Sequence, residues 1–153
     1  MSADPISDLA LVTGLYRTTN AAVRELDQRL MRDHDVTFVQ AVTLLAIDSF
    51  DRPQPHLVAD HLSQHSQTVT GVLDRLERAG HVARCRDLGD RRAVRLELTA
   101  SGRSLVDAMS ATLSEHVCDV LKGVDSGRRN LLHDSLHRLE ESIRSAAPNG
   151  SAG

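Results

Sequence analysis

The hydrophobic period of the sequence changes at Gly80, and this change restricts the fold more than any other feature. Over residues 66–79, apolar side chains recur every three or four positions, the spacing of an amphipathic helix. Over residues 94–98, apolar and charged residues alternate, which is the period of a half-buried strand. Gly80 is therefore expected to end a helix, and the chain beyond it to form strands.

Two helices are predicted before this one. Residues 36–49 carry apolar side chains at helical spacing, and Asp51-Arg52-Pro53 is expected to stop that helix. Pro55 opens a short helix that runs to Leu62. A polar turn over residues 63–65 then leads into the helix at 66–79. Helix, short turn and helix form a helix-turn-helix.

A β-hairpin is predicted to follow directly. Its strands cover residues 82–86 and 94–98, and the turn chemistry of Gly89-Asp90 lies between them. A hairpin after a helix-turn-helix is a wing. The predicted fold is therefore mainly α with a small β-hairpin wing (α+β).

Long amphipathic segments lie at both ends of the chain. Residues 6–34 predict one helix, started by Ser7 or Asp8, and residues 99–121 and 126–145 predict two more, the first capped by Thr99. The apolar positions expected to face inward are Leu9, Val12, Tyr16, Thr19, Val23, Leu26 and Leu30, then Leu105, Met109, Thr112, Val117 and Val120, then Leu132, Leu136, Leu139 and Ile143. Such stripes need a partner. Pairing with a second copy of the chain is favoured over packing on each other within one monomer.

The charge of the chain is unevenly distributed. The net charge of the 153 residues is −3, which disfavours a wholly basic nucleic-acid coat protein. From Arg75 to Arg95, however, there are seven arginines against three acidic residues. This local positive charge falls on the second helix of the helix-turn-helix and on the hairpin, where a DNA duplex needs it. Because aromatic residues make up only 2% of the chain, the core is expected to be aliphatic.

Features of secreted and membrane proteins are missing from the sequence. Two cysteines, Cys85 and Cys118, are too few for a disulfide-stapled domain and match no metal motif. No apolar run approaches the ~18 residues of a membrane span. The N-terminus is acidic and polar, so no signal peptide is expected. A soluble cytoplasmic protein is the expectation.

Residues 56–105 resemble the winged-helix core of the MarR (multiple antibiotic resistance regulator) family. One combination of residues is specific for this family. It consists of Asp90 followed by the arginine pair Arg91-Arg92 in the wing, and of the Leu-Thr-x-x-Gly sequence at residues 98–102 after the wing. The matching pieces are Val58-Ala59-Asp60-His61-Leu62, Thr68-Val69-Thr70, Leu73-Asp74-Arg75-Leu76-Glu77-Arg78-Ala79-Gly80-His81-Val82, Asp90-Arg91-Arg92-Ala93-Val94 and Leu96-Glu97-Leu98-Thr99-Ala100-Ser101-Gly102.

The resemblance implies a homodimer that binds a pseudo-palindromic operator and represses a nearby gene until a small-molecule effector lowers its affinity. It covers nearly the whole chain, because the terminal helices fit the family's dimerisation region. The implied organisation is a dimerisation helix at 1–35, a winged helix-turn-helix at 36–99, dimerisation helices at 100–147 and a disordered tail at 148–153, forming one intertwined domain. The implied partners are double-stranded DNA, a second copy and an unidentified effector, with no membrane and no cofactor.

The helix at 66–79 is expected to read DNA from its N-terminal turns in the major groove. Gln67 can form a bidentate contact with adenine, and Thr68 and Thr70 offer hydroxyl and methyl groups. Ser66 is expected to cap the helix, and Gly71 either permits close approach to DNA or reduces base readout. Arg75 and Arg78 are expected to contact phosphates.

The wing is expected to enter the minor groove. Asp90 lies two residues before Arg92, where its carboxylate can brace the arginine for a narrow groove. The resemblance assigns the groove contact to Arg92, with Arg91 as the neighbouring candidate. The flanking arginines Arg84, Arg86 and Arg95 are expected to contact phosphates.

The sequence says less about an effector. The resemblance places a pocket between the dimerisation helices and the winged helix, and the candidate residues are Tyr16, Asn20, Phe38, Met109 and Leu113. The scarcity of aromatics disfavours a stacking cage but leaves room for a small phenolic or lipophilic ligand.

A zinc- or thiol-responsive regulator of the same fold is the alternative. His61/His65 and His133/His137 have metal-compatible i, i+4 spacing, but no further ligand accompanies either pair. Cys118 could be a reactive thiol. No catalytic residue is predicted, because no nucleophile, phosphate loop or pair of catalytic carboxylates is recognisable, and an enzyme is not expected.

Overall fold

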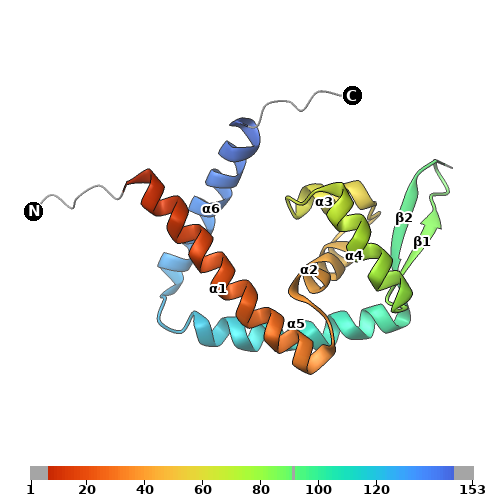
Figure 1. The fold of residues 1–153 in the computed structure, drawn as a ribbon, viewed down its shortest axis with the longest axis horizontal. Coiled ribbons are helices and arrows are strands. Elements are labelled where there is room, and N and C mark those ends of the chain that lie inside the picture. The colour runs from red at the N-terminus through yellow and green to blue at the C-terminus, as the bar shows by residue number, and fades with distance from the viewer. Residues whose placement is uncertain (1–6, 91, 147–153) are drawn as a thin grey trace, which may run out of the picture. The chain divides into compact units, whose positions relative to one another are not determined.

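The computed structural model describes residues 7–90 and 92–146 (Figure 1). Its elements in chain order are α1 (Asp8–His34), α2 (Phe38–Ser49), α3 (Pro55–His61), α4 (Ser66–Arg78), β1 (Val82–Arg86), β2 (Val94–Leu98), α5 (Ala100–Val120) and α6 (Ser126–Ala146). The predicted mainly α fold with a two-stranded wing is confirmed. Arg91 and the tail expected at 148–153 lie outside the described residues.

The chain divides into two compact units. The first runs to Leu113 and contains α1–α4, the hairpin and most of α5, and the second begins at Ser114 and contains the end of α5 and all of α6. Among the described residues, no helix combines the length and the apolar character needed to cross a bilayer.

Three helix starts test the predicted caps. The Ser7 hydroxyl accepts a hydrogen bond from the Ala10 N–H at 3.2 Å, and Thr99 caps α5, so both of these predictions are confirmed. The expected Ser66 cap is wrong. The residue at the cap position of α4 is His65, and no side-chain hydrogen bond caps this helix.

The start of α2 is fixed by two side chains. The Thr37 hydroxyl accepts from the Gln40 N–H at 3.2 Å, and the Gln40 side chain accepts from the Thr37 N–H at 2.8 Å, which is a capping box. The helix therefore begins at Phe38 instead of the predicted Val36, which is buried just before it. Asp27 of α1 accepts from the Phe38 N–H at 2.6 Å and so ties α1 to the positive end of α2.

The end of α4 has the predicted glycine. Gly80 adopts φ 79°, a left-handed conformation that an L side chain rarely adopts. Its N–H donates to the Glu77 carbonyl, and the His81 N–H donates to the Leu76 carbonyl, both at 2.9 Å. These two bonds form a Schellman motif, which reverses the chain into β1.

The two strands pair antiparallel with Arg84 opposite Leu96. Val82, Leu96 and Leu98 point into the core, as the alternating pattern predicts. The Leu96 N–H donates to the Pro53 carbonyl at 2.8 Å, so the outer edge of β2 is attached to the segment between α2 and α3.

A compact junction joins the end of α4, the end of β2 and the start of α5. The Thr99 hydroxyl accepts from the Gly102 N–H at 3.0 Å and donates to the Gly80 carbonyl at 2.6 Å. The Thr99 N–H donates to the His81 carbonyl at 3.1 Å. A Cβ built on Gly102 would lie 2.0 Å from that same carbonyl oxygen, so only glycine fits there.

The core is aliphatic, as the composition predicts. Every helix of the first unit and the strand β2 contribute fully buried apolar side chains to it. The largest of these are Leu30, Leu44, Val58, Leu73, Leu76, Leu96 and Met109. Packing of these side chains fixes α4 and the hairpin against α2 and α5.

We expect Gly102→Ala to lower the free energy of unfolding by about 3 kcal/mol, because neither backbone segment can move away from the new methyl group without breaking the junction. Urea unfolding followed by circular dichroism at fixed protein concentration measures this. Gly71→Ala is the matched control within a helix of the same unit. A Cβ there meets nothing within 4 Å, so alanine should stabilise the fold by up to about 1 kcal/mol. Equal stability of the two variants would contradict the close approach.

Candidate nucleic-acid interface

The two faces of α4 differ sharply in exposure. Val69, Val72, Leu73 and Leu76 are buried, which turns the opposite face outward. The predicted reading residues Ser66, Gln67, Thr68 and Thr70 are all exposed on the first two turns. The structure therefore brings the predicted base-reading side chains together on one surface.

Two positions on this surface, Thr70 and Gly71, offer few groups for hydrogen bonds to DNA. The Thr70 hydroxyl donates to the Ser66 carbonyl at 2.8 Å, so this hydroxyl can offer an incoming group only its acceptor capacity. Gly71 has no neighbour within 4 Å of a built Cβ. Packing within this chain therefore gives no reason for a glycine at that position.

The arginines of α4 remain at the surface. Arg75 and Arg78 are exposed on the later turns. The Arg78 Nε donates to the Asp74 carbonyl at 3.3 Å, which leaves its terminal amino groups to reach outward. Both side chains are exposed, as the predicted phosphate contacts require.

Arg84 has a different environment from the one predicted. Its guanidinium pairs with Asp74 at 2.7 Å and with Glu77 at 2.5 Å, two carboxylates one turn apart on α4. Its side chain is only 27% exposed. Arg84 therefore attaches β1 to α4. The sequence signal for this contact was the pair of acids three residues apart beside a strand arginine.

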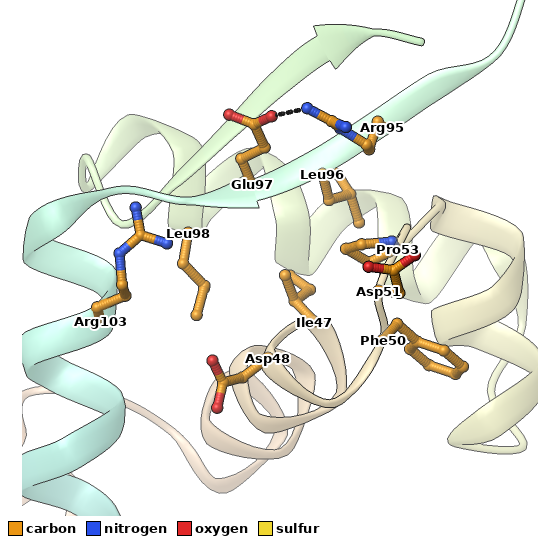
Figure 2. A pocket seen from close by; sticks show the side chains of 10 residues that line it. All are labelled: Ile47, Asp48, Phe50, Asp51, Pro53, Arg95, Leu96, Glu97, Leu98 and Arg103. Atoms are coloured by element: carbon orange, nitrogen blue, oxygen red, sulfur yellow. Dashed lines mark hydrogen bonds and ion pairs between the residues drawn. The ribbon is translucent and has the colours of Figure 1, made fainter. Parts of the chain in front are cut away.

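Arg95 is also engaged within the chain. It pairs with Glu97, and its Nε is buried without a hydrogen-bond partner among the described residues. Figure 2 shows this pair on the wall of a pocket of about 410 Å³ between β2, the start of α5 and the end of α2. A phosphate contact by Arg95 would compete with the Glu97 carboxylate.

The wing turn is held by two aspartates. The Asp87 carboxylate accepts from the N–H groups of Gly89 at 2.7 Å and Asp90 at 3.3 Å. These bonds, that from Gly89 first, hold the pKa of Asp87 below its usual value. The Asp90 carboxylate accepts from the backbone N–H of Arg92 at 2.9 Å. Asp90 thus fixes the Arg92 backbone, whereas the sequence predicted a brace on its side chain.

Arg86 and Arg92 are exposed on the wing, and Arg91 lies outside the described residues. Of the arginines described on α4 and the hairpin, Arg75, Arg78, Arg86 and Arg92 are free of the carboxylate pairings that hold Arg84 and Arg95. Arg86 and Arg92 belong to the hairpin, which Arg84 attaches to α4.

An apolar pocket of about 420 Å³ lies between α1, α2 and α4. None of the described residues that line it is charged. The lining residues are Thr19, Val23, Phe38, Val39, Val42, Thr43, Leu62, Gln64, Thr68, Val69 and Val72. Thr68 belongs both to this wall and to the exposed start of α4.

The residues predicted for an effector pocket lie at three places in the fold. Phe38 lines the apolar pocket. Tyr16 and Asn20 lie along the exposed surface of α1. Met109 is fully buried in the core, and Leu113 packs against it. Sequence reasoning missed the valines of α1 and α2, because an apolar residue beside a pocket has the same periodicity as one inside the core.

The described histidines, cysteines and acids form no group of three that could hold a metal ion. Partial burial, followed by the nearby Glu97 carboxylate, raises the pKa of the Cys85 thiol. A raised pKa lowers the thiolate fraction and hence the reactivity of Cys85. Cys118 is exposed in the second unit.

Known proteins resemble this chain over most of its length. The MarR family model matches residues 34–93. The HTH-type transcriptional regulator TtmR of Methylorubrum extorquens is 30% identical over 145 residues, which are 94% of this chain and 73% of TtmR. The crystal structure of the Staphylococcus aureus MepR–DNA complex aligns with TM-score 0.77 and 22% identity over 92% of this chain and 99% of that one.

A third similar structure is that of a protein whose DNA binding is regulated by a small molecule. BpsR of Bordetella bronchiseptica, described for the regulation of its DNA binding by 6-hydroxynicotinic acid, aligns with TM-score 0.73 and 25% identity. The alignment covers 85% of this chain and 98% of BpsR. With the family model, the winged-helix geometry and the identity to TtmR in agreement, this chain belongs to the MarR family, whose curated relatives are transcriptional regulators and not enzymes.

Proposed function

We propose that this protein is a transcriptional repressor that binds a pseudo-palindromic operator as a homodimer and is released by a small apolar effector. The observation that carries the proposal is the combination of an exposed reading face on α4 with exposed arginines on a wing that Arg84 attaches to the same helix. One element suits the major groove and the other the adjacent minor groove.

Base readout in this proposal falls to the first turns of α4. Gln67 is exposed and matches the bidentate pattern of adenine, and Thr68 can meet a thymine methyl group. Gly71 lets the backbone of α4 approach the groove without a side chain between them. These few contacts are modest, so shape readout by the wing supplies the rest of the specificity.

The arginines divide into two roles. Arg75, Arg78, Arg86 and Arg92 are left exposed to neutralise phosphates or enter the minor groove. Arg84 and Arg95 are paired with carboxylates of the chain. We assign Arg84 to positioning, because its two pairings set how the wing is carried relative to α4.

The homodimer rests on apolar surface left open in each unit. Leu9 and Tyr16 on α1 are 76% and 69% exposed, and Leu132 and Ile143 on α6 are 51% and 62% exposed. None of the described residues of α6 is buried, although the helix has 21 residues. A helix with this pattern is stable when another surface covers it, and a second copy would also match a two-fold operator.

The apolar pocket is the proposed effector site. Its volume suits a small ring compound, and its uncharged wall favours a neutral ligand over an ion. Thr68 and Val69 of α4 form part of that wall. A ligand wedged against them displaces the start of the reading helix relative to α1 and α2, so it binds the DNA-free state better than the DNA-bound one.

DNA binding is tested with the tightest duplex that the full-length protein selects from a random-sequence pool. We expect Arg92→Ala to weaken the affinity at least about tenfold and to reduce the slope of log K against log salt by about 1–2, because two wings per dimer lose phosphate-region contacts. Arg128→Ala is the control, since it removes the same charge from an exposed site on α6. No selected duplex, or equal losses in both variants, would count against the proposal.

Dimerisation is tested by placing charge on the α6 stripe. We expect the double variant Leu132→Glu/Leu136→Glu to shift the mass measured by sedimentation equilibrium from dimer toward monomer, because the buried carboxylates lack partners. Arg138→Glu, on the opposite side of the same helix, should leave the dimer intact. A wild-type monomer at micromolar concentration would overturn the homodimer.

The effector site is tested with p-cresol as a neutral probe and benzoate as its anionic counterpart. We expect p-cresol to lower DNA affinity and benzoate to have little effect, since no charged residue described in the pocket can pair with the carboxylate. Val42→Trp should fill the pocket, so we expect it to abolish the p-cresol response and to lower the basal DNA affinity as the bound ligand does. A response that survives Val42→Trp would place the ligand elsewhere.

A further inference from the structure

Leu88 lies in the turn of the wing, between Asp87 and Gly89, and its side chain is almost wholly in solvent. It is 98% exposed, the highest value among the large hydrophobic side chains that the structure describes as exposed. Single exposed leucines are common on protein surfaces. This one is unusual in its place, because it lies in the turn between the exposed arginines Arg86 and Arg92.

The fold of the turn does not require a leucine there. The turn is closed by the Asp87 carboxylate, which accepts from the Gly89 and Asp90 N–H groups, and by the Ala93 N–H, which donates to the Asp90 carbonyl at 2.9 Å. None of these bonds involves the side chain of Leu88. A polar residue would close the same turn and would avoid exposing an apolar group.

The same bonds make the turn well suited to hold an apolar side chain in a fixed direction. The carboxylates of Asp87 and Asp90 accept hydrogen bonds from backbone N–H groups of the turn. Gly89, the residue after Leu88, has no side chain that could cover the leucine. The turn therefore carries an apolar side chain on a backbone held by hydrogen bonds, with Arg86 at the end of β1 before it and Arg92 in the turn after it.

The minor groove offers a matching surface. It is about 6 Å wide, its floor is lined by base edges, and its walls are the apolar faces of deoxyribose. Proteins that bind this groove commonly place leucine and similar side chains against the sugars or between base steps, with arginines alongside. The wing turn has this combination of one apolar side chain and neighbouring arginines.

We propose that Leu88 is a DNA-contacting residue whose side chain packs between the sugar walls of the minor groove while Arg92 supplies the charge. This inference rests on the proposed function, because it needs the wing to enter DNA. It separates the two contributions at the wing: Arg92 contributes a salt-dependent contact, and Leu88 contributes a salt-independent one that senses groove width.

The test compares full-length Leu88→Ser and Leu88→Met with wild type on the selected duplex. We expect Leu88→Ser to weaken binding about tenfold with an unchanged salt slope, because an apolar contact releases no counterions. Leu88→Met should bind within about twofold of wild type, since methionine fills a similar apolar volume. Hydroxyl-radical footprinting should show sugars under the wing that wild type and Leu88→Met protect and Leu88→Ser exposes. Thermal unfolding should be the same for all three proteins, since the side chain packs on nothing.

The outcomes separate this inference from the proposed function. Wild-type affinity and footprint in Leu88→Ser, together with a loss in Arg92→Ala, overturn the role of Leu88 and leave the repressor intact. A Leu88→Ser variant that also flattens the salt slope overturns it too, because the leucine then acts through the placement of charges. A wild-type protein that selects no duplex overturns both.

Discussion

The close approach of Gly102 to the His81 carbonyl is the constraint on which the arrangement of the reading elements depends. At this point the end of α4, the end of β2 and the first turn of α5 meet within hydrogen-bonding distance, and Thr99 bonds to both neighbours. Because a Cβ at position 102 would lie 2.0 Å from a backbone oxygen, the three elements cannot approach so closely with any other residue. The Schellman motif at Gly80 then fixes the direction in which the hairpin leaves α4. The relative placement of reading helix and wing thus follows from two glycines and one threonine.

Carboxylates decide which arginines of this surface are available. The sequence shows seven arginines between residues 75 and 95, and their number alone suggests a uniform basic patch. In the fold, Asp74 and Glu77 engage Arg84, and Glu97 engages Arg95. Asp87 and Asp90 instead bind backbone N–H groups of the wing turn. The acids on α4 and β2 therefore pair with Arg84 and Arg95 and remove them from the exposed basic surface. The aspartates of the turn fix the backbone of the wing, which presents Arg86 and Arg92 to solvent.

The order and type of the elements could be predicted from the sequence because periodicity, Gly80 and Pro55 act locally. The start of α2 was misplaced by two residues because the Thr37–Gln40 capping box competes with the apolar pattern at Val36. The expected Ser66 cap failed because the helix start depends on backbone conformation, which places His65 at the cap position. Asp74 and Glu77, the partners of Arg84, lie on α4, and their spacing is the only signal of this contact in the sequence. Glu97, the partner of Arg95, lies two residues along the same strand. A count of charges over residues 75–95 shows neither pairing. The effector residues Tyr16 and Asn20 follow from the pocket position that the family resemblance implies, and they stay a prediction; the structure places them beside a hollow along α1, apart from the apolar pocket lined by valines.

Burial of apolar surface links the remaining features of the molecule. The first unit fills its core with aliphatic side chains and leaves one apolar pocket beside α4. The terminal helices, by contrast, leave leucines and valines in solvent in each unit. The pocket wall includes Thr68 and Val69 of the reading helix, so filling it changes the packing of the same helix whose outer face would meet DNA. If a second copy covers the α1 stripe, it also limits how far α1 can move when the pocket fills, so a ligand there is expected to act on α4. Dimerisation and effector release then depend on the same helix, because α1 would carry the dimer contact at its start, with Leu9 and Tyr16, and the pocket further along the same stripe, with Thr19 and Val23.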